Sequence, residues 1–200
     1  MKSRRRFLIE GAAVGIALSA IEGVRAAAGP SASSRLVHRP YRVIYDNRIP
    51  QSLQFAQRAA HRGLLTAAID GDLSRLWRKI LQPQMRLAPA LFVGLTAAPS
   101  LFCLGEFAKN HWMKVQFCAE HHSTREGTVR HALYGPANIL RLANRLAGAG
   151  GGWPESMADI AGSCPTQLEA TLRTSIITPL HPSPPIEEPL VSWMIAPGTA

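Results

Sequence analysis

The sequence predicts an α/β protein: a three-layer sandwich with a mostly parallel sheet (βαβαβαβ) and an antiparallel β-hairpin at one edge. Short apolar segments recur about every 25 residues with helical segments between them, which is the rhythm of a parallel sheet. Hydrophobic residues make up 46% of the 200 residues and charged residues 18%. This composition excludes a disordered chain, because disorder goes with low hydrophobicity and dense charge.

The first half of the chain supplies the βα repeat. Strands are predicted at 41–45, 64–69, 90–95 and 113–118. Ser52 is positioned to cap a helix over 53–62, and Asp72 to cap a second helix. The second helix carries apolar residues at 73, 76, 77, 80 and 81, the spacing of an amphipathic helix that faces a core. Pro99 opens a third helix, which runs to Lys109.

After Glu120 the rhythm changes. A turn over 122–128 leads into a strand at 129–134, which we expect to pair antiparallel with the strand before it. Helices follow from Pro136 to Gly148 and over 154–160, with a flexible glycine joint at 150–152, and Thr166–Glu169 has the form of a capping box. A last strand at 190–195 is expected to pair at a sheet edge. The predicted organisation is a flexible leader over 29–40, an α/β domain over 41–147, and a Gly/Pro-rich extension over 148–200 that packs on the same domain.

The N-terminus has the layout of a secretory signal. A basic segment precedes the apolar run 11–21, which is too short to span a membrane, and small residues at 26–28 suit signal peptidase, with Ala26 at −3 and cleavage after Ala28. The segment Ser3-Arg4-Arg5-Arg6-Phe7-Leu8 resembles the twin-arginine (Tat) export motif, with Arg4, Arg5, Phe7 and Leu8 at its defined positions. The resemblance covers the signal only. It implies the Tat translocase and signal peptidase as partners, passage across the membrane in a folded state, and the periplasm as destination.

Charge and cysteine content limit the other partners. Residues 1–28 hold five of the 22 basic and two of the 13 acidic residues, so the remaining chain has a net charge of +6. Basic residues crowd the stretch 35–62, which in a cytosolic protein would suggest nucleic acid as a partner. Nucleic acid is not expected as a partner of an exported chain. No transmembrane helix is expected in the mature chain, because no uncharged apolar stretch reaches about 18 residues. Cys103, Cys118 and Cys164 are too few for a disulfide scaffold.

The candidate site follows from the predicted sheet. Ligands of open parallel sheets bind outside the carboxyl ends of the strands. The residues that follow the predicted strands are candidates for ligand binding: Asp46, Arg48, Asp70, Asp72, Glu120 and His121. As solvated carboxylates, Asp46, Asp70 and Glu120 are expected to add little to stability, whereas Asp72 is expected to contribute as a helix cap. A purely structural alternative makes Asp72 a helix cap and Asp46 the partner of Arg48 in a tight turn.

Metal binding is one specific version of this site. Cys118, Glu120 and His122 share one face of the predicted fourth strand because side chains alternate, and His131 lies on the return strand. Thiolate, carboxylate and imidazole suit zinc or another transition metal. The spacing matches no established metal motif, so polar strand ends remain the alternative.

Nucleophilic catalysis is a second version. Gly94-Leu95-Thr96-Ala97-Ala98 stands at a strand-to-helix turn, as the Gly-x-Ser-x-Gly elbow of hydrolases does, but with threonine for serine and alanine for the last glycine. Asp159 and His181 follow in triad order. The structural alternative makes Thr96 a helix cap.

The third version of the site is a binding function that requires no catalysis. A small exported α/β domain can bind a solute, or serve as an accessory protein that docks onto a larger exported enzyme that contains a cofactor. Trp153, Trp193 and Met194 are the apolar residues that would anchor such docking, and core packing explains them equally well. We expect one of these two binding functions, with a metal-dependent or Thr-nucleophile hydrolase as the alternative.

Overall fold

The computed structural model describes residues 40–70, 72–88, 90–163, 171–179, 186 and 188–198. The predicted signal with Arg4, Arg5, Phe7, Leu8, Ala26 and Ala28 lies outside the described residues. So do most of the leader, the capping box at 166–169, and the side chains of Cys164 and His181.

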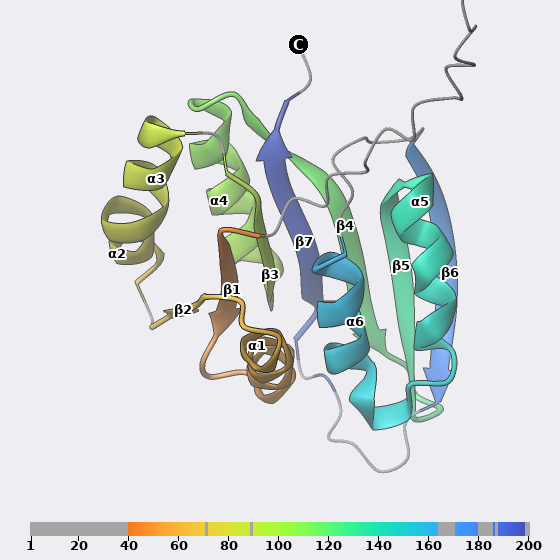
Figure 1. The fold of residues 1–200 in the computed structure, drawn as a ribbon. Coiled ribbons are helices and arrows are strands. Elements are labelled where there is room, and N and C mark those ends of the chain that lie inside the picture. The colour runs from red at the N-terminus through yellow and green to blue at the C-terminus, as the bar shows by residue number, and fades with distance from the viewer. Residues whose placement is uncertain are drawn as a thin grey trace, which may run out of the picture. The chain divides into compact units, whose positions relative to one another are not determined.

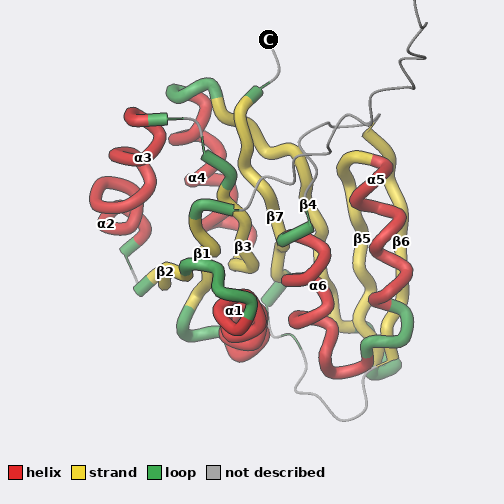
Figure 2. Tube along the Cα trace, in the orientation of Figure 1, coloured by secondary structure: helices red, strands yellow, loops and turns green. Residues whose placement is uncertain are grey.

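A seven-stranded mixed sheet forms the centre of this domain, with the strand order β2-β1-β3-β7-β4-β5-β6 (Figures 1 and 2). The strands are β1 (Arg42–Asp46), β2 (Thr66–Ile69), β3 (Phe92–Ala97), β4 (Met113–Ser123), β5 (Thr128–Pro136), β6 (Thr171–Pro179) and β7 (Leu190–Pro197). The fold class is therefore α/β, as the sequence predicts.

The prediction of a mostly parallel sheet is wrong. β1 pairs parallel with β2 and β3, whereas every other pairing is antiparallel. Both β3 and β4 pair antiparallel with β7, so β4 still runs in the direction of the first three strands. The βα rhythm sets the direction of β1–β4 correctly, but it does not reveal that another strand separates β3 from β4.

That separating strand is β7, which was expected at an edge. It lies between β3 and β4, and residues 190–195 are all buried. A strand covered on both faces carries apolar residues on both, as Leu-Val-Ser-Trp-Met-Ile does. The segment after residue 148 thus contributes a central element of the sheet.

The helices are α1 (Pro50–His61), α2 (Leu73–Leu76), α3 (Gln82–Leu87), α4 (Ala98–Lys109), α5 (Ala137–Leu140) and α6 (Trp153–Ala161). The π-helical turn η1 (Trp77–Leu81) joins α2 to α3, so this helix continues beyond Pro83, where the sequence predicts its end. A wider turn accommodates Pro83, which has no N–H to donate to the preceding turn. The 3₁₀ turns η2 (Arg141–Leu146) and η3 (Gly150–Gly152) connect α5 to α6. The predicted flexible joint is thus one ordered turn.

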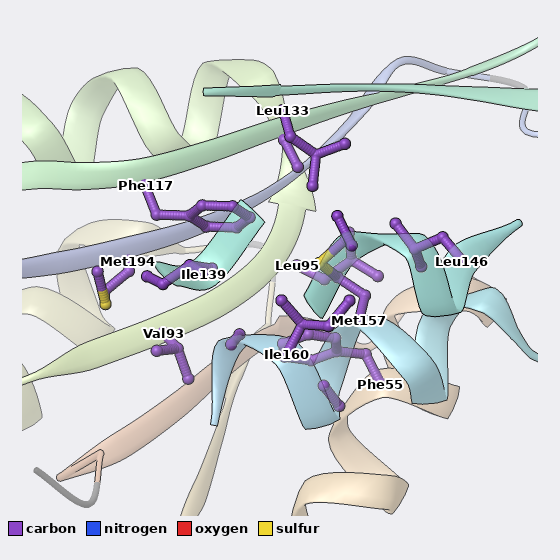
Figure 3. Packing of buried hydrophobic residues seen from close by; sticks show 14 of the residues in the cluster. Phe55, Val93, Leu95, Phe117, Leu133, Ile139, Leu146, Met157, Ile160 and Met194 are labelled. Carbon is purple, nitrogen blue, oxygen red and sulfur yellow. The ribbon is translucent and has the colours of Figure 1, made fainter. Parts of the chain in front are cut away.

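Helices cover both faces of the sheet. On one face, α1, α5 and α6 pack against β1, β3, β4, β5 and β7. Figure 3 shows Met157 and Ile160 of α6 gathered with Phe55 of α1 and Leu95 of β3. On the other face, α2, η1, α3 and α4 cover a second cluster around Phe92 and Trp193. The sheet is the middle layer of three.

Gly94 of β3 lies where the neighbouring strands β1 and β7 approach too closely for a side chain. A Cβ added to Gly94 of β3 would lie 2.5 Å from the indole of Trp193 on β7 and 2.7 Å from the carbonyl oxygen of Ile44 on β1. Real Cβ atoms do not approach other atoms so closely, so the absent side chain is what allows Trp193 to lie against β3.

One strand was not predicted. β6 forms the edge of the sheet next to β5, and six of its nine residues are exposed: Thr171, Leu172, Arg173, Ser175, Ile177 and Pro179. Its Thr/Ile-rich sequence is typical of strands, but it shows little apolar alternation. In the described part of the chain, no helix is long and apolar enough to cross a membrane.

Candidate functional site

The carboxyl ends of β1, β2 and β3 form the candidate site. β1 lies between its two parallel neighbours, and the helices of the two connections pack on opposite faces, α1 on one and α2–α3 on the other. In open α/β sheets such a reversal of strand order opens a crevice at the strand ends where ligands bind. We call the residues here, Asp46, Asn47, Arg48 and Asp70, the strand-end site.

Asp46 and Arg48 form the fixed part of the strand-end site. The Asp46 side chain is completely buried at the end of β1, whereas 68% of the Arg48 side chain is exposed. Nε and Nη2 of Arg48 donate to Oδ1 and Oδ2 of Asp46 at 2.9 and 2.7 Å, and the Arg48 backbone N–H donates to Oδ1 at 3.0 Å. These bonds hold the pKa of Asp46 below its ordinary value, against the opposing effect of burial.

Asp46 is therefore not the solvated carboxylate that the sequence suggests. Its backbone N–H donates to Oγ of Ser52 at 2.8 Å, and the Ser52 hydroxyl donates to the carbonyl of Leu95 on β3. Ser52 was expected to cap α1, but α1 begins at Pro50 and receives no side-chain cap. Ser52 instead ties the end of β1 to β3, and so fixes where Asp46 holds Arg48.

Further carboxylates surround Arg48. Asn47 Nδ2 donates to Oδ1 of Asp70 at 3.4 Å, which joins the ends of β1 and β2. The hydrogen bonds to Asp46 raise the pKa of Arg48 most, and the negative charges of Asp46, Glu188 and Asp70 add to this effect. Asp72 does not join this group, because its carboxylate accepts from the backbone N–H groups of Ser74 and Arg75. It is the cap of α2, as predicted.

Glu120 lies apart from the strand-end site. The register places Thr96 of β3 opposite Val191 of β7, and Val191 opposite Glu120 of β4. Adjacent strands are about 4.8 Å apart, so two strand spacings separate Glu120 from Thr96 and a third lies between Thr96 and β1. The structure brings Asp46 and Asp70 together and does not bring Glu120 to them.

Thr96 is unsuited to act as a nucleophile. It is completely buried, its Oγ1 accepts from the indole N–H of Trp193 at 3.0 Å, and it donates to the carbonyl of Ala97 at 3.2 Å. It does not cap α4, whose N-cap residue is Ala97. Asp159 pairs with Arg58 and Arg62 at 2.8 and 2.9 Å, between α6 and α1. His181 lies outside the described residues.

The metal candidates divide between the two faces of the sheet. Cys118, Glu120 and His122 alternate along one face of β4, where Glu120 Oε2 and His122 Nε2 are 3.5 Å apart. His131 is on the opposite face. Burial and the charge of Glu120 raise the pKa of Cys118 to about 11, so the thiol stays protonated at neutral pH, whereas metals bind thiolate. Within the described residues, no three His, Cys, Asp or Glu side chains form a metal-binding group, and Cys103 and Cys118 are free thiols.

His121 and His131 form a buried pair that the sequence analysis missed. Both rings are completely buried, with their Nδ1 atoms 2.6 Å apart and the indole of Trp153 packed over both. His121 Nε2 lies 2.7 Å from Oγ of Ser192, and His131 Nε2 lies 3.1 Å from Oγ1 of Thr178. His121, expected at the ligand edge, thus faces the core instead.

Hydrogen bonds connect Ser192, His121, His131 and Thr178 in a row, and the bond from Thr178 to Leu146 determines the direction of the others. Thr178 donates its hydroxyl hydrogen to the carbonyl of Leu146 at 2.5 Å, so its oxygen accepts from His131 Nε2–H. His131 Nδ1 is then the acceptor for His121 Nδ1–H, and His121 Nε2 accepts from the Ser192 hydroxyl. This arrangement needs both rings neutral. Burial lowers the pKa of His131 to about 4 and, together with the neighbouring histidines, that of His121 well below its ordinary value.

A sequence signal for this pair exists. His131 alternates with the buried Val129 and Leu133, and His121 with the buried Phe117 and Ala119. Period-two alternation with apolar neighbours places a polar residue on the core face. The proposed docking anchors also belong to the core, because Trp153, Trp193 and Met194 are at most 1% exposed.

Comparison of the chain with protein-family models, with curated proteins and with solved structures gives no match.

Proposed function

We propose that the protein is exported to the periplasm by the Tat pathway and there binds a small polar solute at the strand-end site. The observation that carries this proposal is the pairing of a completely buried Asp46 with a largely exposed Arg48 at the carboxyl end of β1. A surface arginine ordinarily loses side-chain entropy when a ligand fixes it. Here Asp46 holds the guanidinium in place before any solute arrives.

The charges favour a solute with two kinds of polar group. Arg48 offers N–H donors to a carboxylate or another anionic group. α1 and α4 begin after the parallel strands β1 and β3, so the positive ends of both helix dipoles lie at this edge. Neither helix has an acidic residue in its first turn or a side-chain cap to offset that charge. Asp70 and Glu188, which act on Arg48, would accept hydrogen bonds from hydroxyl or ammonium groups. A zwitterionic or hydroxylated carboxylate fits this combination.

Thermal unfolding in the presence of a ligand panel tests the proposal. The panel consists of free amino acids, hydroxy acids, dicarboxylates and neutral sugars. We expect at least one carboxylate class to raise the melting temperature of the unaltered protein, because a ligand stabilises the state that it binds. Arg48→Gln should abolish this shift, whereas Arg75→Gln, which removes an exposed arginine from α2, should retain it. A shift that survives Arg48→Gln, or no shift with any panel member, would contradict the proposal.

An accessory role is the second candidate, favoured by two exposed aromatic residues. Phe102 on α4 is 69% exposed and Trp112, in the turn after α4, is 89% exposed. Trp112 also has a positive φ of 58°, which is uncommon for a bulky residue. Co-purification of one exported enzyme with the protein, and its loss in Trp112→Ala but not in Leu87→Ala, would support docking over solute binding.

A further inference from the structure

Among the described residues, nothing protects the outer edge of β6. β6 ends the sheet, and no described segment pairs with its outer side. Soluble proteins shield such edges by making the strand short, by placing lysine or proline in it, or by adding a bulge. β2, at the other edge, is four residues long. β6 has nine residues, one charged side chain, and proline only at its last position.

The exposed apolar residues of β6 add to this liability. Leu172 and Ile177 are 51% and 58% exposed, on opposite faces of the strand. The domain therefore leaves apolar surface exposed on both faces of β6. Pairing with another strand would cover part of both side chains and would supply hydrogen-bond partners for the outer backbone groups.

We propose that this edge is a homodimer interface, in which β6 pairs antiparallel with β6 of a second copy of the chain. Side chains alternate, so paired residues on the same face have numbers that differ by an even amount. The register that centres on Ser175 obeys this rule and pairs all nine residues. The two seven-stranded sheets then continue into one another.

This register is self-complementary in charge. Arg173, the charged residue of β6, lies opposite Ile177 of the second copy, and Thr174 lies opposite Ile176, so no like charges face each other. Cross-strand pairs of β-branched side chains favour a sheet, whereas directly opposed like charges disfavour it. The dimer does not depend on solute binding, since the strand-end site lies at the other end of the strand order, at β1 and β2.

Sedimentation velocity of the full chain over a range of concentrations tests the interface. We expect a dimer. Ile177→Lys places a lysine opposite Arg173 at two symmetric positions and should weaken dimerisation about tenfold, whereas Ile177→Glu places a carboxylate there and should strengthen it. Leu65→Lys is the matched control, because Leu65 is also 58% exposed but lies beside β2, and it should leave the dimer unchanged.

A crosslink tests the register independently. Ser175→Cys brings two thiols together on the symmetry axis, so mild oxidation should give a covalent dimer that neither the unaltered chain nor Ser74→Cys, on exposed α2, forms. A chain that stays monomeric at every concentration overturns the proposal. So does a dimer that responds alike to Ile177→Lys and Ile177→Glu, or one that Ser175→Cys fails to crosslink.

Discussion

The Nδ1 atoms of His121 and His131 lie 2.6 Å apart in a site that excludes solvent. Only one hydrogen fits between two ring nitrogens at this distance. A proton added to His131 would place two N–H groups against each other, and one added to His121 would meet the hydroxyl hydrogen of Ser192. This set of hydrogen bonds therefore requires both rings to be neutral.

This pair predicts that stability falls with acid in a defined window. The folded-state pKa values of both histidines lie below the value of about 6.5 in the unfolded chain, so the unfolded state takes up protons first. Stability is complete above pH 6.5 and declines as the pH falls towards about 4. For His131 alone the shift corresponds to about 3 kcal/mol. Urea unfolding at several pH values measures the effect.

Two variants serve as references for that experiment. His61→Gln, which replaces an exposed histidine of α1, should leave the decline unchanged, whereas His131→Asn should reduce it. An unfolding free energy that does not vary between pH 6.5 and 4.5 would contradict the buried neutral pair.

Gly94→Ala is predicted to destabilise the domain strongly. Its methyl group would meet both the indole of Trp193 and the backbone of Ile44, and the backbone contact leaves little room to relax. Overpacking of a core costs about 1–3 kcal/mol, and we expect the upper end of this range. Gly148→Ala is the control, because nothing lies within 4 Å of an added Cβ there. Chemical denaturation would show an equal loss for the two variants if the close approach were unimportant.

Asp46→Asn should lower the melting temperature at neutral pH more than Asp70→Asn does. Asp46 is buried and charge-paired, whereas Asp70 is exposed. Because the pKa of Asp46 is lowered in the folded state, its contribution is present above the unfolded value of about 3.9 and is lost as the pH falls through the folded value. The difference between the variants should therefore shrink in acid. Equal melting temperatures at neutral pH would show that the ion pair adds nothing.

Asp72→Ala should cost about 1 kcal/mol of stability, as the loss of a helix cap does. Its carboxylate bonds to the backbone of Ser74 and Arg75 at the start of α2. Asp72→Ser keeps a capping oxygen and should recover most of the loss in the same denaturation measurement. Failure of serine to rescue would assign the effect to charge instead.

Arg4→Lys combined with Arg5→Lys should leave the precursor in the cytoplasm, because the paired guanidinium groups are what a Tat receptor reads. Cell fractionation and immunoblotting measure this. Arg25→Lys, which lies in the proposed signal but outside the motif, is the control and should permit export. Continued export of the double variant would assign the signal to the general secretory route.

Local patterns in the sequence predict the positions of the strands and helices better than they predict which strands pair. The apolar segments of β1 and β3 and the capped amphipathic helix after Asp72 appear where the sequence places them. The position of β7 depends on contacts with β3 and β4, about 95 and 75 residues earlier, and no periodicity encodes such a pairing. The buried run 190–195 does carry a cue, because a strand that is apolar on both faces belongs inside a sheet.

The site shows the same limit. The β1–α1 turn and the cap at Asp72 are local, and both were anticipated. That Glu120 lies away from Asp46, and that His121 turns inward to meet His131, follows from where β7 and β5 pair with β4. A shift of one residue would reverse which of His121 and His122 faces the core.

The central place of β7 also bears on the order in which this chain can be made and moved. The ribosome releases residues 1–28, the proposed export signal, first and residues 190–197 about 160 residues later. Until then β3 and β4 each lack the partner that β7 supplies, and their bare edges favour aggregation. A chain that enters a channel for unfolded proteins during synthesis would do so before β7 is made. A translocase that accepts folded proteins allows β7 to complete the sheet before translocation. Any truncation before residue 190 should accordingly yield insoluble protein, however intact its signal.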